Sequence, residues 1–136
     1  MATAVDTLGD RWVLLILREA FYGVQRFDDI LQDLNIPKSV LTDRLKRMIE
    51  SGLMERFEYQ EPGTRKRAAY GLTQKGRELA PVMIALKEWG EKHALHAPSP
   101  VDIQSTGSGD WLRLHPVDSQ GHLIAWEDVR LVKRTA

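Results

Sequence analysis

The sequence of 136 residues contains no cysteine. This absence excludes disulfide bonds, thiolate zinc sites, cysteine nucleophiles and thiol redox switches. The sequence also lacks an apolar run near the roughly 18 residues that a membrane-spanning helix needs, because Arg18 ends the longest run, residues 12–17. Since the first residues show neither the basic nor the apolar region of a signal peptide, we expect a cytoplasmic protein with no membrane partner.

Motifs of common catalytic and nucleotide-binding sites are missing as well, namely GxSxG, the P-loop and GxGxxG. Residues 107–109 read Gly-Ser-Gly, but they are too short for such a motif and lie in a linker-like stretch. The carboxylates form no convincing pair that would face into a site. We therefore expect neither an enzyme nor a cofactor.

The formal net charge is zero, which by itself argues against nucleic-acid binding. The charges are unevenly distributed, however. Residues 38–47 carry a local charge of +3, and residues 61–67 carry a local charge of +2. Acidic residues elsewhere offset them, notably within residues 28–33 and near the C-terminus. The distribution indicates a polarised molecule with two basic segments that could contact a polyanion.

The hydrophobic periodicity predicts several helices and one short β-hairpin. The expected elements are a helix over 11–21 capped by Asp10, a link at 24–26 able to add an edge strand, helices over 27–34 and 37–51, strands over 53–59 and 68–72 around a turn at 61–64, and a long helix from its cap Thr73 to about residue 95. Because the helix over 11–21 is apolar nearly all round, we expect it to lie at the centre of the core.

This order of elements is that of a winged helix-turn-helix, a mainly α-helical fold with a small β-hairpin wing. We expect a DNA-binding and dimerisation domain over residues 1–96 and a linker rich in Pro, Gly and Ser over 97–110. Residues 111–136 contain two short apolar runs around a turn signal at 118–121. They predict a C-terminal extension, a β-hairpin packed on the domain or on the dimer.

The helix over 37–51 and the turn after the first strand contain the candidate DNA contacts. Leu41, Leu45, Met48 and Ile49 form an apolar stripe on the helix, and the opposite face is polar. Considered alone, that face fits a solvated surface equally well, whereas the basic turn is harder to explain as a solubilising loop. The candidate DNA-binding residues are Lys38, Ser39, Thr42, Asp43, Arg44, Lys46, Arg47, Arg65, Lys66 and Arg67.

A second apolar stripe lies on the last predicted helix and is either core or a dimer interface. We favour a dimer interface, because a small helical domain offers this stripe little to cover and an exposed tryptophan is costly. Its residues are Leu79, Val82, Met83, Leu86 and Trp89. Trp12, Met83 and Trp89 could line a pocket for an aromatic or apolar ligand at that interface, although core packing explains each of them too.

His93 and His96 are three residues apart beside Glu91, a spacing that could present a metal-binding face on a helix. With no cysteine and no HExxH-type motif, ordinary surface histidines explain this spacing better, and we expect no metal.

Several segments, in order along the chain, resemble the HxlR family of bacterial transcriptional regulators. The resemblance covers about residues 4–92 and implies a dimeric DNA-binding regulator whose first and last helices form the dimer contact. Many members sense oxidants or electrophiles through a reactive cysteine just before the first helix. Because this chain has no cysteine, the resemblance does not extend to thiol sensing. The matching segments are Leu8-Gly9-Asp10-Arg11-Trp12, residues 14–19, Gly23, Arg26-Phe27, residues 41–45, residues 52–56, and residues 70–73 leading into Gly76.

We therefore predict a homodimeric, sequence-specific transcriptional regulator, either a repressor or a dual regulator, that binds a double-stranded DNA operator. A small-molecule effector would act by changing the distance between the two recognition helices. Two alternatives stay open, a winged-helix module for protein–protein contact and a small-molecule sensor that binds at the dimer interface. The basic turn at 61–67 favours DNA over a protein partner, which has no need of it.

Overall fold

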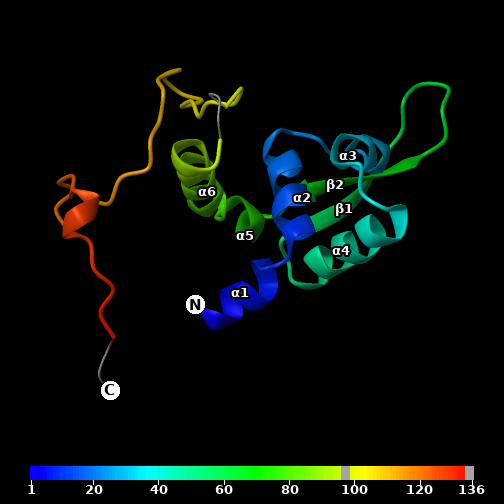
Figure 1. Cartoon of the computed structure of the whole chain (residues 1–136). Coiled ribbons are helices and arrows are strands. Elements are labelled where there is room, and N and C mark those ends of the chain that lie inside the picture. The colour runs from blue at the N-terminus through cyan, green and yellow to red at the C-terminus, as the bar shows by residue number, and fades with distance from the viewer. Residues whose placement is uncertain (96–98, 134–136) are drawn as a thin grey trace. The chain divides into compact units, whose positions relative to one another are not determined.

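The fold is described from a computed structural model, which describes residues 1–95 and 99–133. The chain divides into two compact units, Met1–Met83 and Ile84–Ala136. Helix α6 (Ala80–His93) begins in the first unit and continues in the second. The other elements of the first unit are α1 (Ala2–Leu8), α2 (Arg11–Phe21), α3 (Phe27–Leu34), α4 (Lys38–Glu50), β1 (Met54–Tyr59), β2 (Arg67–Leu72) and α5 (Gln74–Arg77) (Figure 1).

Helix α2 forms the centre of the first unit, as the sequence predicts. The Asp10 side chain caps it by accepting hydrogen bonds from the backbone N–H groups of Trp12, at 2.9 Å, and Val13, at 3.2 Å. Ile16 and Leu17 are completely buried. The helix ends where Gly23 adopts a φ of +83°, a conformation that favours glycine over other residues.

The core of the first unit combines side chains from α2, α3, α4 and β1. One stripe of α4 packs into it, and the polar face of that helix is left exposed. The buried apolar residues of this core are Val13, Ile16, Leu17, Ile30, Ile36, Leu41, Leu45, Met48, Leu53 and Met54. The buried stripe on α4 is therefore confirmed.

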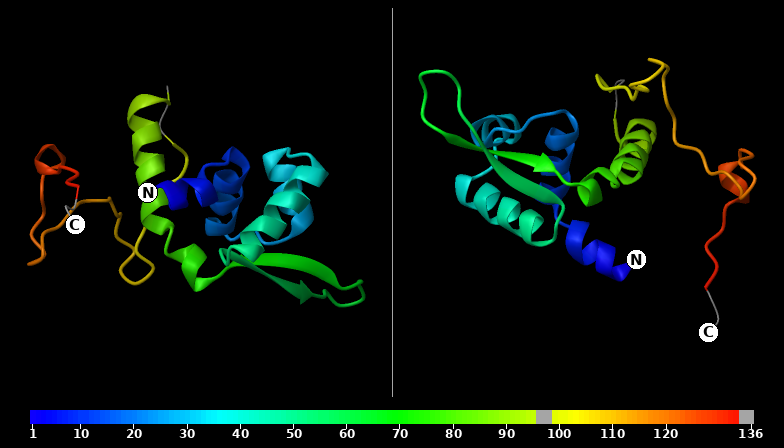
Figure 2. Two further views of the ribbon diagram at one scale, coloured as in Figure 1. Left: turned by 90° about the horizontal axis from the view of Figure 1, so that it is seen from below. Right: turned by 180° about the vertical axis from the view of Figure 1, so that it is seen from behind.

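Strands β1 and β2 form the predicted antiparallel hairpin, with a register that runs from Met54 opposite Leu72 to Tyr59 opposite Arg67. The predicted turn forms too: Thr64 N–H donates to the Glu61 carbonyl at 3.0 Å, and Gly63 has a φ of +75°. At positions 24–26 the expected edge strand is reduced to one bridge between Arg26 and Ala69. Figure 2 shows that the hairpin tip extends beyond the helices of the first unit.

The single long helix expected from Thr73 to about residue 95 is wrong. Thr73 does cap a helix, because its hydroxyl accepts a hydrogen bond from Gly76 N–H at 3.1 Å. That helix is the short α5, and α6 begins separately at Ala80. Pro81 explains the break, because it has no N–H to donate to the Arg77 carbonyl and disfavours the helical conformation of the residue before it.

The β-hairpin expected in residues 111–136 is wrong as well. Within residues 99–133 the β pairing consists of isolated bridges, Gln104 with Trp111 and Val117 with Leu123, followed by the 3-10 helix η1 (Trp126–Asp128). The turn at 118–121 does form, with Asp118 N–H donating to the His122 carbonyl at 3.0 Å. The ladder does not continue past the bridge between Val117 and Leu123, because Pro116 has no backbone N–H to donate to the opposite strand.

The domain boundary predicted at 96–97 falls on residues 96–98, which lie outside the described residues, and stays a prediction. None of the helices in residues 1–95 and 99–133 has both the length and the hydropathy that crossing a bilayer requires.

Gly76 should be essential for docking α5 against the start of β1. A Cβ atom at this position would lie 2.1 Å from the Leu53 carbonyl oxygen, closer than any real contact. We expect Gly76→Ala to lower the free energy of unfolding by about 2 kcal/mol, as measured by urea titration. Gly90→Ala is the matched control, because a Cβ there meets nothing within 4 Å and should stabilise α6 by about 0.5–1 kcal/mol. Equal unfolding midpoints for the two variants would contradict this account.

Candidate nucleic-acid interface

The exposed face of α4 contains most of the side chains predicted to contact DNA. Lys38, Ser39, Thr42, Asp43, Lys46 and Arg47 are all exposed. The side chain of Lys46 is 74% exposed. Its partner on this helix is Glu50, whose carboxylate lies 3.9 Å from the Lys46 ammonium. At that separation an exposed pair contributes little, so Lys46 can exchange Glu50 for another anion.

Two polar residues of this face already have partners within the helix. The Thr42 hydroxyl donates to the Lys38 carbonyl at 2.9 Å. The Asp43 carboxylate lies 2.5 Å from Nη1 of Arg44 and 3.6 Å from Nε of Arg47. The two arginines reduce the negative potential that Asp43 would otherwise present on this face.

Arg44 differs from the other predicted contacts because most of its side chain is covered and its guanidinium is engaged within the protein. Its Nη2 lies 2.9 Å from Oδ2 of Asp10, the capping residue of α2, and only 21% of its side chain is exposed. The hydrogen bond from Arg44 holds the pKa of Asp10 below its usual value. Arg44 Nε is buried and has no hydrogen-bond partner within residues 1–95 and 99–133. The structure thus places Arg44 as a link between α2 and α4.

The second group of predicted contacts is exposed at the basic hairpin loop, a name used here for Arg65 and Lys66 together with Arg67, the first residue of β2. Lys66 lies 3.9 Å from Glu58 on β1. In the part of the chain that the structure describes, neither Arg65 nor Arg67 forms an ion pair. Two guanidinium groups are therefore available to an external anion.

Arg26, which the sequence analysis did not select, fixes the hairpin loop to the start of α3. Its guanidinium forms an ion pair with Glu61 in the loop and lies over the Tyr59 ring, 4.9 Å from the ring centroid. The hydrogen bond from Glu61 raises the pKa of Arg26. These residues are 35 positions apart, and nothing in their local sequence indicates that they meet.

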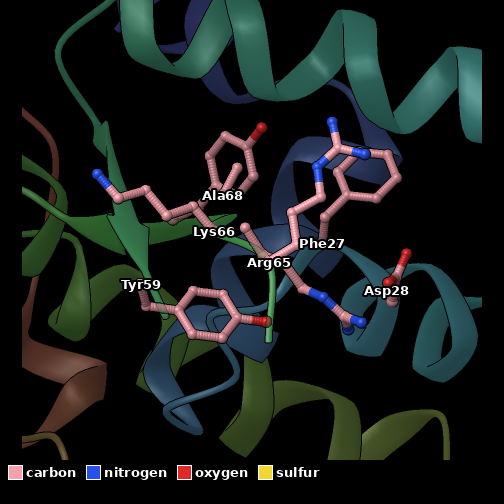
Figure 3. Close-up of a pocket in the computed structure, with 8 residues that line it drawn as sticks. Phe27, Asp28, Tyr59, Arg65, Lys66 and Ala68 are labelled. Atoms are coloured by element: carbon pink, nitrogen blue, oxygen red, sulfur yellow. The ribbon is translucent and has the colours of Figure 1, made fainter. Parts of the chain in front are cut away.

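A pocket of about 460 Å³ lies between the start of α3 and the hairpin (Figure 3). The rings of Phe27 and Tyr70 are neighbours within its wall, with centroids 6.4 Å apart. The pocket is lined by Phe27, Asp28, Tyr59, Arg65, Lys66, Arg67, Ala68 and Tyr70. Its cations are among the predicted DNA contacts, whereas Phe27 and Tyr59 follow ordinary helix and strand patterns and give no local signal of a site.

The residues of the stripe predicted on the last helix differ in how far they are buried. Leu79 and Met83 pack against the core of the first unit. Val82, Leu86 and Trp89 are exposed, with Trp89 at 63%. The predicted ligand pocket of Trp12, Met83 and Trp89 combines residues of separate units and stays a prediction.

No group of three His, Asp or Glu residues within the described ranges could hold a metal ion. His93 stacks beside Trp89, with ring centroids 5.3 Å apart. His96 lies outside the described residues, so the interpretation of these histidines stays a prediction.

Comparison with known families decides what kind of protein carries this interface. The family model for the HxlR-like helix-turn-helix matches residues 7–98. The chain belongs to this family. The predicted winged helix-turn-helix is therefore confirmed by both the architecture and the family, and the C-terminal hairpin is the part of the fold that the structure corrects. HxlR-like proteins are transcriptional regulators, which confirms the expectation that this member is not an enzyme.

Curated relatives are described as HTH-type transcriptional regulators. An uncharacterised HTH-type transcriptional regulator of Mycobacterium tuberculosis is 39% identical over 97 residues, which cover 71% of this chain and 60% of the relative. The chain thus spans less than two thirds of that relative. YvaP of Bacillus subtilis, another uncharacterised HTH-type regulator, is 40% identical over 87 residues, covering 63% of this chain and 79% of YvaP.

Solved structures agree with the fold. The crystal structure of PA1607, a candidate transcription factor, has a TM-score of 0.79 at 32% identity and covers 96% of this chain and 91% of its own. This match extends past the family-model region into the C-terminal segment. The reduced form of the redox regulator HypR has a TM-score of 0.60 at 27% identity, covering 67% of this chain and 89% of HypR.

Asp10 should stabilise the fold both as a helix cap and through its ion pair with Arg44. We expect Asp10→Ala to lower the free energy of unfolding by about 1 kcal/mol at pH 7. Asp10→Asn keeps the cap but not the charge. Because the folded pKa of Asp10 lies below its ordinary 3.8, the charge stabilises the protein above that pH, and this contribution is lost as the pH falls through the folded pKa.

Urea titrations of the wild type and of Asp10→Asn from pH 7 to pH 2 should therefore converge at the acid end. Asp6→Asn is the matched control, because Asp6 is an exposed acid on α1. A constant difference between wild type and Asp10→Asn at every pH would show that the charge of Asp10 is irrelevant to folding.

Proposed function

We propose that this protein is a homodimeric, sequence-specific DNA-binding regulator, either a repressor or a dual regulator. Each subunit would insert α4 into a major groove and rest its hairpin loop on the neighbouring phosphates. The observation that supports this most directly is the accessibility of the cations: Lys46, Arg47, Arg65 and Arg67 are exposed on one unit. Arg44, in contrast, would act from inside by setting the position of α4.

Affinity and specificity would come from different side chains. The loop cations and Arg47 would neutralise phosphates and release counterions, a contribution that falls with rising salt and ignores sequence. Lys38, Ser39 and Lys46 would face base edges, where lysine can read guanine and serine can bond several bases. Thr42 and Asp43 could join them by exchanging their partners within the helix for base atoms.

Dimerisation would supply the second recognition helix. Val82, Leu86 and Trp89 form an exposed apolar stripe of a kind that a second copy could cover. A symmetric dimer would then read two half-sites about 34 Å apart, one turn of DNA. An effector that changed the spacing of the two α4 helices would disturb both half-sites together.

Removal of the loop cations should weaken DNA binding and flatten its salt dependence. We expect Arg65→Ala combined with Arg67→Ala to lower the slope of log K against log salt by about 2, since each phosphate contact contributes about 0.9. Fluorescence anisotropy would measure binding to DNA from immediately upstream of the coding region and to a scrambled duplex. Lys46→Ala should reduce the preference for the native duplex instead.

Arg130→Ala is the control for that experiment, because it removes an exposed cation outside the proposed interface. Unchanged affinity in both the loop double variant and Lys46→Ala would refute the proposed DNA interface. In that case a protein partner would be the better assignment for the winged helix.

The dimer should depend on the exposed stripe of α6. Leu86→Asp places a charge within this stripe, and since Leu86 is already 48% exposed the monomer should still fold. We expect sedimentation to show a mass near 15.5 kDa for this variant and twice that value for the wild type. Lys92→Asp introduces the same side chain away from the stripe and should remain dimeric. A dimeric Leu86→Asp would mean that another surface holds the subunits together.

A further inference from the structure

We propose that the pocket between α3 and the hairpin binds a small aromatic acid, and that this ligand competes with DNA for the loop cations. The competition rests on the proposed function, whereas ligand binding itself does not. The pocket lies entirely within the first unit and draws its walls from two elements distant in sequence, the start of α3 and the hairpin (Figure 3).

The aromatic content of the pocket favours a flat, unsaturated ligand. Three of its eight lining residues are aromatic, Phe27, Tyr59 and Tyr70. Phe27 and Tyr70 are tilted by 50° to each other, so their faces are not used up by mutual stacking. The volume of about 460 Å³ lies in the range, roughly 300–1,000 Å³, of small-molecule sites. A simple inorganic anion would leave these apolar walls without a contact.

The charge of the pocket favours an acidic group on that ring. Arg65, Lys66 and Arg67 line it together with a single carboxylate, Asp28. Arg65 and Arg67 have no ion-pair partner among the described residues, and a guanidinium group matches the geometry of a carboxylate in a bidentate pair. The neighbouring Glu61 is already paired with Arg26 and does not compete for these cations.

Competition with DNA follows from shared residues. The guanidinium groups that would bind the ligand carboxylate are those proposed to neutralise phosphates. A ligand that occupies them while DNA is absent must weaken DNA binding by the same factor by which DNA weakens ligand binding. Regulation would then need no change of fold, because the ligand acts at the DNA-binding surface itself.

The test is isothermal titration calorimetry of the full chain with 2-naphthoate as the probe. We expect 2-naphthoate to bind at least tenfold more tightly than uncharged 2-naphthamide and than the non-aromatic cyclohexanecarboxylate. Inorganic phosphate should not displace it at equal concentration. Equal binding of 2-naphthoate and 2-naphthamide, or effective displacement by phosphate, would overturn the proposal.

Four variants separate this proposal from the proposed function. Tyr59→Leu and Phe27→Leu each remove a ring but no cation, and both should weaken 2-naphthoate at least fivefold while the protein stays folded by circular dichroism. Arg47→Gln removes a cation of α4 outside the pocket, so it should weaken DNA binding and leave 2-naphthoate unchanged. Arg67→Gln should weaken both ligands.

The two failures are distinguishable. Binding of 2-naphthoate that depends on Tyr59 and Arg67, in a protein without DNA affinity, would uphold the pocket and remove the competition with DNA. Tight DNA binding with no heat from 2-naphthoate, or with unaltered DNA affinity at saturating 2-naphthoate, would overturn the inference and leave the proposed function standing.

Discussion

The arrangement of the candidate interface depends on one carboxylate. Asp10 accepts hydrogen bonds from the first turn of α2 through one oxygen and from Arg44 of α4 through the other. The central core helix and the candidate recognition helix are thereby joined at a single residue. Charge-assisted hydrogen bonds are short and directional, so they fix orientation as well as distance. The apolar core under α4 resists separation of the helices but resists sliding less, because apolar contacts have no preferred direction.

The uneven distribution of charges explains how a chain of zero net charge can present basic segments, even though several acids lie among them. Acids near the interface are used within the protein: Asp10 and Asp43 by Arg44, and Glu61 by Arg26. Three acids are thus matched by only two arginines, so the excess of cations comes from their clustering in residues 38–47 and 61–67. The net charge of a protein is a poor guide to its local potential, which depends on where the charges lie.

Local sequence patterns were sufficient to predict the features that depend only on residues close together in the sequence. The cap at Asp10, the buried stripe of α4 and the turn at Gly63 all follow from neighbouring residues, and they were predicted correctly. Contacts between distant segments were not predictable, and the Arg26–Glu61 pair, the Asp10–Arg44 pair and the aromatic wall of the pocket are of this kind. The prediction of a C-terminal hairpin was wrong for another reason: its turn forms, but Pro116 lacks the N–H donor that a continuous ladder needs.

The absence of cysteine limits how such a regulator could receive a signal. HypR is described as a redox regulator, and a chain without thiols cannot form the disulfides or thiol adducts on which cysteine-based sensing depends. A non-covalent ligand remains available as a signal, and it would act most economically where it meets groups proposed to contact DNA. Between α3 and the hairpin, aromatic walls adjoin guanidinium groups that form no ion pair within residues 1–95 and 99–133, so apolar contact and charge can be satisfied by one small molecule. Since the Tyr70 N–H donates to the Gln25 carbonyl at 2.8 Å, the second strand of the hairpin is already tied to the segment before α3, and a ligand there would lose less free energy in ordering the site.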